Sequence, residues 1–197
     1  MTPGGGQEIE MLQGERIALR EFRREDIEPI QAWVNNENIT RYLAFPLFPQ
    51  TREETTEFVE RQLLKRDSPR NGIFVIALKD DPDLKYVGSV GLHRIDYRNR
   101  NCELGIVIGR EELLGQGLGR EAICLVLDFA FKFLNLRKVN IRTYEYNERA
   151  RRCYLRCGFR EEGRIRQQRY YDGRYWDEIL LGITKEEYLR GLRRPSK

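Results

Sequence analysis

Hydrophobic residues recur at every second position in some segments of the chain and at every third or fourth in others, which predicts strands and helices. Strands are expected over Glu15–Phe22, Ile73–Lys79, Tyr86–Ile95, Cys102–Ile108 and Lys138–Tyr146. Helices are expected over Asp26–Asn35, Thr51–Lys65, Gly117–Leu134, Asn147–Arg156 and Lys185–Leu192. A hairpin is expected where Arg160–Tyr171 and Tyr175–Gly182 flank Asp172-Gly173, because this dipeptide favours a tight turn.

The order of these elements predicts a mixed α/β sheet in a single domain over residues 14–192. The length of 197 residues agrees with this, since about 100–200 residues make one domain. Residues 1–13, which include three consecutive glycines, and residues 193–197 are expected to be tails.

Composition and charge exclude several classes of protein. Lys and Arg total 35 and Asp and Glu total 31, so the net charge of +4 creates no strong field for nucleic acid or an anionic membrane. The most apolar stretch, Ala122–Leu134, is interrupted by Asp128 and Lys132 and is too short to span a membrane. The N-terminus lacks the basic start and apolar run of a signal peptide. We therefore expect a cytoplasmic protein that contacts no membrane.

The cysteines and the histidine give no sign of a metal centre. Cys102, Cys124, Cys153 and Cys157 lack a CxxC spacing, and His93 is the only histidine. We expect free thiols, as in a reducing cytosol, and no bound metal.

Three alternate glycines, Gly115, Gly117 and Gly119, stand between a predicted strand and the long predicted helix. Glycine lets the backbone approach a ligand closely, and a helix start offers unpaired N–H groups and a positive dipole end. The loop therefore predicts an anion site, most naturally for phosphates, with Arg120 as a charged donor. Arg120 and Glu121 stand where a P-loop or a dinucleotide fingerprint would need other residues. A tight turn without a ligand is the alternative.

A second motif follows the next predicted strand and reads Asn147-x-x-Ala150-x-x-x-Tyr154-x-x-x-Gly158-Phe159. Asn147 is suited to cap the following helix, and Tyr154 lies one turn after Ala150 on the same helix face. Its hydroxyl can reach a ligand beside the glycine loop if both helices begin on the same side of the sheet. The alternative is a helix cap followed by a core aromatic residue.

The glycine loop Gly115–Ala122, followed along the chain by Asn147–Phe159, resembles the two motifs of the GNAT superfamily of acetyl-CoA-dependent N-acetyltransferases. The similarity covers roughly residues 14–190. Asp172–Asp177 and Ala32–Asn36 resemble its ribosomal-protein (Rim-type), polyamine and amino-sugar branches. The resemblance implies a mostly antiparallel sheet with flanking helices and one splayed pair of parallel strands. The family usually has Gln or Arg where this chain has Leu114, so the contact made there is lost or supplied elsewhere.

The resemblance also implies how acetyl-CoA, the co-substrate, would bind. Its pantetheine arm would pair with the backbone of Ile106, Val107 and Ile108, where an N–H group would polarise the thioester carbonyl. The pyrophosphate would lie on Gly115, Gln116, Gly117, Leu118, Gly119 and Arg120. Asn147 would hydrogen-bond the pantetheine amide, and Arg149, Arg151 or Arg152 would meet the 3′-phosphate.

Direct attack of an amine on the thioester needs a base and an acid. Glu103 shares a strand face with residues 105 and 107 and is the candidate base, directly or through water, with a cross-strand ion pair as its alternative role. Tyr154 is the candidate acid for the departing thiolate, since a phenol has a pKa near 10. Cys153 is not expected to be a nucleophile, because no histidine lies nearby in the sequence to activate it.

The acceptor is the least defined part of the prediction. In such folds the first two helices, their loop and the last hairpin form the acceptor pocket. The loop Tyr42–Pro49 is apolar and has no carboxylate, although Glu37, Glu53 and Glu54 flank it. A polyamine needs carboxylates, so the loop favours a protein or peptide N-terminal amine. A small-molecule amine, such as a polyamine, amino sugar or aminoglycoside-like compound, is the alternative.

Two further classes compete with an enzyme. A non-catalytic CoA-binding sensor would keep the glycine loop and lack Tyr154, which is present. An RNA-binding module would use the nine arginines between Arg149 and Arg174, but interspersed acidic residues dilute their charge. We therefore expect acetyl-CoA and an amine as partners, and no nucleic acid. A homodimer is compatible with this prediction.

Overall fold

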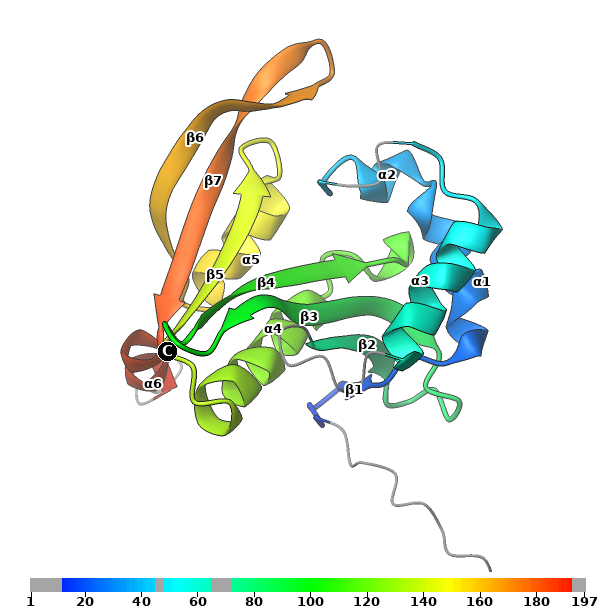
Figure 1. The fold of residues 1–197 in the computed structure, drawn as a ribbon, viewed down its shortest axis with the longest axis horizontal. Coiled ribbons are helices and arrows are strands. Elements are labelled where there is room, and N and C mark those ends of the chain that lie inside the picture. The colour runs from blue at the N-terminus through cyan, green and yellow to red at the C-terminus, as the bar shows by residue number, and fades with distance from the viewer. Residues whose placement is uncertain (1–11, 45–47, 65–71, 193–197) are drawn as a thin grey trace, which may run out of the picture.

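The computed structural model describes residues 12–44, 48–64 and 72–192, so most of both predicted tails lies outside the described part (Figure 1). Its strands are β1 (Ile17–Arg20), β2 (Gly72–Leu78), β3 (Tyr86–Asp96), β4 (Asn101–Ile108), β5 (Lys138–Tyr144), β6 (Arg160–Tyr171) and β7 (Arg174–Thr184). Its α-helices are α1 (Ile27–Val34), α2 (Glu37–Thr40), α3 (Arg52–Leu64), α4 (Leu118–Asp128), α5 (Glu148–Arg156) and α6 (Lys185–Leu192). The predicted order of strands and long helices is confirmed.

The seven strands form one sheet in the order β1-β2-β3-β4-β5-β7-β6. Among the described strands, β4 and β5 alone are parallel, and they pair at three positions: Asn101 with Lys138, Cys102 with Val139 and Glu103 with Asn140. Where the pairing ends, the Asn140 side-chain amide donates to the Cys102 carbonyl at 3.2 Å. Beyond this point the two strands diverge (Figure 1). The predicted mixed, mostly antiparallel sheet with a splayed parallel pair is therefore confirmed.

The two faces of the sheet carry different hydrophobic clusters, and β4 contributes to both. Leu104 is buried in the larger cluster with α4 and α5, and Ile106 packs against it. Val107 packs against the smaller cluster, which contains Trp33 of α1 and Val59 of α3. Alternate residues of a strand point to opposite faces, so β4 separates an α4–α5 side from an α1–α3 side.

Local signals predicted several element ends correctly. Thr51 and Glu54 form the expected capping box of α3, with the Glu54 N–H donating to the Thr51 hydroxyl at 3.2 Å and the Thr51 N–H donating to the Glu54 carboxylate at 2.8 Å. Asp172 and Gly173 both have positive φ, 51° and 75°, as a type I′ hairpin turn requires.

Two elements differ from the prediction. The long helix is regular only to Asp128 and continues as a π-helical turn over Phe129–Phe133, where the Leu134 N–H donates to the Phe129 carbonyl at 3.0 Å. The segment after Asn35 contains the short helix α2, because the Asn36 side chain accepts the Asn38 N–H at 3.0 Å and caps it.

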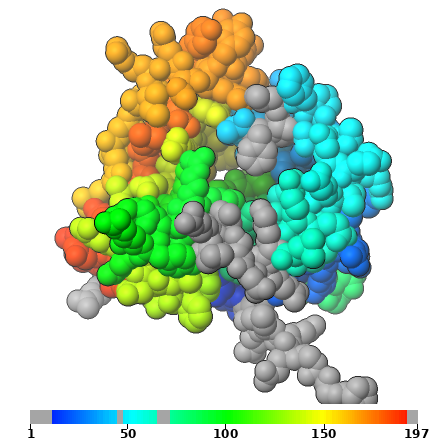
Figure 2. Space-filling model, viewed as in Figure 1, coloured from blue at the N-terminus to red at the C-terminus, as the bar shows by residue number. Residues whose placement is uncertain are grey.

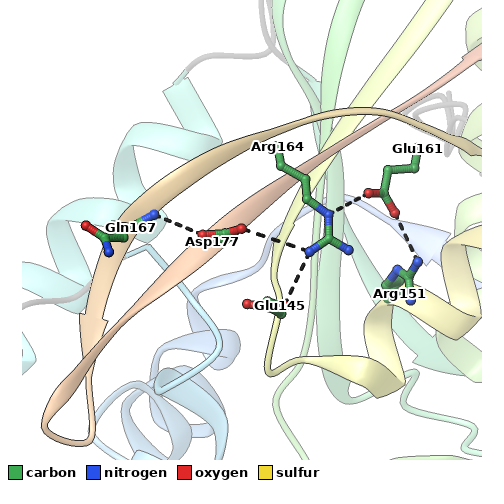
Figure 3. Close-up of polar contacts among 6 residues, drawn as sticks. All are labelled: Glu145, Arg151, Glu161, Arg164, Gln167 and Asp177. Carbon is green, nitrogen blue, oxygen red and sulfur yellow. Dashed lines mark hydrogen bonds and ion pairs between the residues drawn. The ribbon is translucent and has the colours of Figure 1, made fainter.

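A network of charged residues connects the β6–β7 hairpin to the segment just after β5 and to α5 (Figure 3). Arg164 of β6 contacts Glu161 at 2.8 Å and reaches Glu145, just after β5, at 3.3 Å. Glu161 also contacts Arg151 of α5 at 3.0 Å. One exposed ion pair contributes little, but this network fixes the hairpin relative to α5.

The four cysteines are free thiols, as expected. Within residues 12–44, 48–64 and 72–192, none of the helices has the length and apolar character needed to cross a membrane.

Candidate active site

A cleft of about 1110 Å³ lies at the gap between β4 and β5. Residues of α4 and α5 line it on one side of the sheet and residues of α1 and α3 on the other, so it extends through the sheet. Figure 2 shows the surface hollowed between the β6–β7 hairpin and the α2–α3 region. Of the predicted site residues the following line the cleft: Glu103, Ile106, Val107, Ile108, Gly115, Gly117, Leu118, Gly119, Arg120, Asn147 and Tyr154.

The splayed end of β4 presents a free backbone edge to the cleft. The Gly109 N–H donates to the Val87 carbonyl at 2.8 Å, which fixes which residues exchange hydrogen bonds with β3. In an antiparallel pair, every second residue of a strand exchanges backbone hydrogen bonds with the neighbouring strand, so Val107 and Gly105 bond to β3. The N–H and C=O groups of Ile106 and Ile108 therefore point to the opposite edge of β4. Beyond Glu103 that edge pairs with no strand of the described residues, so it can pair with an extended ligand.

The glycine loop has the geometry of an anion site. Gly115 and Gly117 adopt φ of 78° and 86°, a region that favours glycine. Gly117 is the N-cap of α4, and the Glu121 N–H makes the first intrahelical bond, to the Gly117 carbonyl at 3.1 Å. The N–H groups of residues 118–120 therefore have no intrahelical acceptor and are available to phosphate oxygens.

Gln116 is the predicted site residue that the structure places away from the cleft. Its side-chain amide donates to the Glu112 carbonyl at 2.7 Å, and its own carbonyl accepts Arg16 Nη1 at 2.9 Å. Glu121 accepts the Arg16 N–H at 2.8 Å, so Arg16 attaches the loop to the start of β1. Gln116 therefore supports the loop from its outer side. Neighbouring residues of a tight turn point in different directions, so a place in the glycine loop does not by itself bring a side chain into the cleft.

Two polar residues of the β5–α5 segment face the cleft. The Asn147 side-chain oxygen accepts the Ala150 N–H at 3.2 Å, which confirms its capping role and leaves its amide N–H groups available to a ligand. The Thr143 hydroxyl is buried, lines the cleft and has no hydrogen-bond partner among the described residues. Thr143 was missed by the sequence analysis, because a single threonine in a strand belongs to no motif.

Arginines on the α4–α5 side give the cleft one positive end. Arg120, Arg149 and Arg156 line it, and none forms an ion pair with another residue in the described part of the chain. Of the other two arginines considered for the 3′-phosphate, Arg152 pairs with Glu148 at 2.9 Å and Arg151 pairs with Glu161. Arg149 is therefore the one of those three that combines a place in the cleft with an unpaired charge.

Tyr154 lies on α5 at the α4–α5 side of the gap. It is only 7% exposed and belongs to the larger hydrophobic cluster, yet it also lines the cleft. Burial raises the pKa of its hydroxyl well above the usual value near 10, so the phenol keeps its proton at neutral pH. No hydrogen bond links this hydroxyl to another described residue, so the proton can be donated to a ligand.

Glu103 and His93 lie on the α1–α3 side of the gap. The Glu103 carboxylate contacts Arg94 at 3.0 Å and Arg142 at 3.2 Å, so the ion pairs considered as its alternative role are present. Its role as a base stays a prediction. His93 is directly opposite Glu103 in the β3–β4 register and also lines the cleft. The sequence analysis considered His93 only as a metal ligand, because its position depends on strand register.

The α1–α3 part of the cleft combines apolar side chains with glutamates and arginines, and Arg61 pairs with Glu57 at 3.6 Å. Ile30, Trp33 and Phe58 line it together with Glu54 and Glu57 of α3. Tyr42, Leu43 and Ala44 of the predicted acceptor loop also line it, whereas residues 45–47 lie outside the described part. From the last hairpin, Glu178 of β7 contributes.

Comparisons with known proteins show to which family the chain belongs. Residues 16–160 match the family model described as an acetyltransferase (GNAT) domain. Spermidine N(1)-acetyltransferase of Vibrio cholerae serotype O1 is 31% identical over 174 residues, which cover 88% of this chain and 96% of that protein. YokL, an uncharacterized N-acetyltransferase derived from the SPbeta prophage of Bacillus subtilis, is 31% identical over 175 residues, covering 89% of this chain and 93% of that protein.

A solved structure extends the similarity to three dimensions. The crystal structure of spermidine N-acetyltransferase from Vibrio cholerae in complex with CoA and spermine matches with a TM-score of 0.77 at 30% identity, covering 88% of this chain and 98% of that one. The chain therefore belongs to the GNAT family of acetyl-CoA-dependent N-acetyltransferases.

Proposed function

We propose that the acceptor of this acetyltransferase is a small-molecule polyamine, not the N-terminal amine of a protein. The observation that carries the proposal is the pair of carboxylates Glu54 and Glu57, which line the cleft from one helix. They stand three residues apart on α3 and so share a helix face. The loop Tyr42–Pro49 has no carboxylate, and for that reason the sequence favoured a protein amine as acceptor. The carboxylates that line the cleft come instead from α3, the helix that follows the loop.

The distribution of charge in the cleft supports the proposal. Unpaired arginines lie on the α4–α5 side, where three phosphate groups of CoA need cations. On the α1–α3 side, Glu54, Glu57, Glu103 and Glu178 accompany Arg61, Arg94 and Arg142. A polyamine carries an ammonium group beyond the one that reacts, and that group needs a carboxylate partner in a partly apolar pocket.

An aromatic contact narrows the approach to the cleft. The Tyr146 hydroxyl donates to the Arg41 carbonyl at 2.6 Å, and the Tyr42 and Tyr146 rings lie 5.9 Å apart. Tyr146 also stacks on Tyr171 of β6 at 5.1 Å. The end of α2 is thus joined to the hairpin, which favours a thin, flexible acceptor over a folded protein.

Two relatives named as spermidine acetyltransferases point the same way, whereas the putative ribosomal N-acetyltransferase YdaF of Bacillus subtilis, 28% identical, favours the alternative of a protein acceptor. Spermidine N(1)-acetyltransferases of Vibrio cholerae and Escherichia coli are 31% and 28% identical to this chain. The Vibrio cholerae structure holds spermine together with CoA.

The cleft residues also suggest how the transfer proceeds. Acetyl-CoA supplies an activated acetyl group as a thioester, held by the glycine loop, Asn147 and the β4 edge. The N–H of Ile106 or Ile108 donates to the thioester oxygen, which draws electrons away from the carbonyl carbon. The amine attacks that carbon directly and loses a proton, and Tyr154 protonates the departing sulfur.

A panel of acceptors tests the proposal. Thiol release from acetyl-CoA is expected with spermidine and spermine, and not with a short peptide that has a free α-amine, an amino sugar or an aminoglycoside. Release with the peptide alone would contradict a polyamine acceptor and support the protein amine. Tight acetyl-CoA binding without thiol release on any amine would support the sensor instead.

Substitutions on α3 give a matched test of the acidic face. The double variant Glu54→Gln, Glu57→Gln is expected to raise KM for spermidine about tenfold, because each lost charge-assisted contact costs about 1.5–3 kcal/mol when fully made and less when exposed. Gln at position 54 keeps the capping box. The control is Glu53→Gln, which removes a charge from α3 outside the cleft lining and should leave KM unchanged. Equal increases of KM in both variants would mean that the negative charge of α3 acts only at a distance, and that Glu54 and Glu57 do not contact the acceptor.

A further inference from the structure

His93 lies in the floor of the cleft beside the point where the sheet opens. It stands opposite Glu103 in the β3–β4 register, and the next pair on the same face is Gly91 with Gly105. Ile73 of β2 fills the space over Gly91, whereas Gly105 has no side chain between its backbone and the imidazole. A Cβ at Gly105 would lie 3.1 Å from His93 Nε2, so the ring edge borders this space closely.

The imidazole of His93 is available to accept a proton. No hydrogen bond links it to another residue of the described chain. Burial lowers the pKa of His93 below its usual 6.5, so the ring is neutral at pH 7 and one nitrogen carries a free lone pair. The charged groups around it oppose one another: Glu103 raises this pKa and Arg94 lowers it, while Arg142 of β5 and Glu57 and Arg61 of α3 line the same cleft.

The Glu103 carboxylate is a weaker candidate for the same task. Each of its oxygens faces a guanidinium group, Arg94 at 3.0 Å and Arg142 at 3.2 Å. Both oxygens are thus already engaged in ion pairs, and an amine would have to displace a guanidinium group to reach either of them. Its negative charge is better placed to stabilise a protonated imidazole across the strand pair.

The position of His93 also complements that of Tyr154. The odd-numbered residues of β4 and their partner His93 face the α1–α3 side, from which the amine would enter. Tyr154 faces the α4–α5 side. The reacting carbonyl would therefore lie between a proton acceptor on one face of the sheet and a proton donor on the other.

We propose that His93, not Glu103, accepts the proton that the amine loses during acetyl transfer. The nitrogen lone pair of the amine forms the C–N bond, the N–H electron pair returns to nitrogen as the proton moves to the imidazole, and the C–S electron pair leaves with sulfur. Tyr154 gives that sulfur a proton, and solvent then exchanges protons with His93 and Tyr154. The proposal rests on the acetyltransferase activity but not on which amine is the acceptor.

The test compares the pH dependence of kcat for the wild type, His93→Gln and Glu103→Gln, with acetyl-CoA and the best amine of the panel both saturating. In the wild type, kcat should fall on the acid side with an apparent pKa below 6.5. His93→Gln should lower kcat by about 10²-fold and remove this acid limb, and added imidazole should restore part of the rate. Glu103→Gln should keep the limb and move it to lower pH, because loss of the negative charge lowers the pKa of His93.

The opposite pattern would overturn the proposal. If Glu103→Gln removed the acid limb and His93→Gln kept it, Glu103 would be the base. If His93→Gln left kcat and its pH profile unchanged, His93 would have no catalytic role. Calorimetric titration with acetyl-CoA shows that each variant is folded, and absence of turnover by the wild type on every amine would instead contradict the proposed function.

Discussion

Replacing Tyr154 with Phe is expected to lower kcat by about 10²–10⁴-fold and to leave the affinity for acetyl-CoA almost unchanged, because proton donation by a positioned side chain contributes about that factor. The substitution removes one oxygen atom from a side chain that is otherwise packed in the core, so the shape of the cleft is preserved. Because no described residue bonds to this hydroxyl, its loss leaves no protein group unpaired. Thiol release under saturating substrates measures kcat, and calorimetry measures binding.

The pH dependence and a matched variant separate this role from a packing role. Burial raises the pKa of Tyr154 above its usual value near 10, so the hydroxyl should not cause an alkaline fall in rate below about pH 10. Tyr188→Phe is the control: Tyr188 is also a buried tyrosine of the same cluster, its hydroxyl donates to the Cys124 carbonyl at 3.3 Å, and it is not part of the cleft lining. It should lose stability but not kcat. An unchanged kcat in Tyr154→Phe would end the general-acid hypothesis.

The parts of the site that the sequence predicted are those built from one continuous segment. The positive φ of Gly115 and Gly117 and the cap made by Asn147 depend on neighbours within a few residues, so their motifs are visible in the sequence. The splay of β4 from β5 was implied by the family resemblance and not by either strand. The hydrogen bond at the point where the pairing ends, from the Asn140 amide to the Cys102 carbonyl, joins residues that are 38 positions apart.

The parts that the sequence did not predict depend on how distant segments meet. His93 and Glu103 face each other because of the β3–β4 register, and a shift of one residue would place His93 on the other face. The direction of Gln116 away from the cleft follows from its contacts with Arg16 and Glu112. The acidic residues of the acceptor side were sought in the loop, whereas the cleft uses one face of α3, whose orientation depends on its packing against α1 and β3.

These relations also explain why the cleft can hold two unlike substrates. The free β4 edge, the glycine loop and the unpaired arginines are suited to a long anionic ligand that enters from the α4–α5 side. In the proposed function, a cation enters from the α1–α3 side, where Glu54 and Glu57 of α3 line the cleft. The two substrates would then meet where the sheet opens, and the proposal places acetyl transfer in the gap beside His93 and Tyr154.

Gly117→Asp is expected to weaken acetyl-CoA binding by at least about 100-fold, whereas Gly117→Asn should weaken it by less than about tenfold, since like charges brought together cost several kcal/mol. Position 117 has φ of 86° and is the N-cap of α4. Asp and Asn tolerate this backbone region better than other side chains, have nearly the same size and cap helices equally well, so the pair isolates the effect of one negative charge. Within the part of the chain that the structure describes, the new Cβ would have one close neighbour, the end of the flexible Arg16 side chain, at 3.2 Å.

The Asp variant should therefore stay folded while it loses its ligand. Its carboxylate would accept the N–H groups at the start of α4 that otherwise serve the pyrophosphate, and it would repel the phosphates directly. Thermal unfolding should show a melting temperature no lower than that of the Asn variant, and calorimetric titration with acetyl-CoA should show the difference in affinity. If both variants bound acetyl-CoA equally well, the pyrophosphate could not lie at this helix start, and the glycines would serve only to form a tight turn.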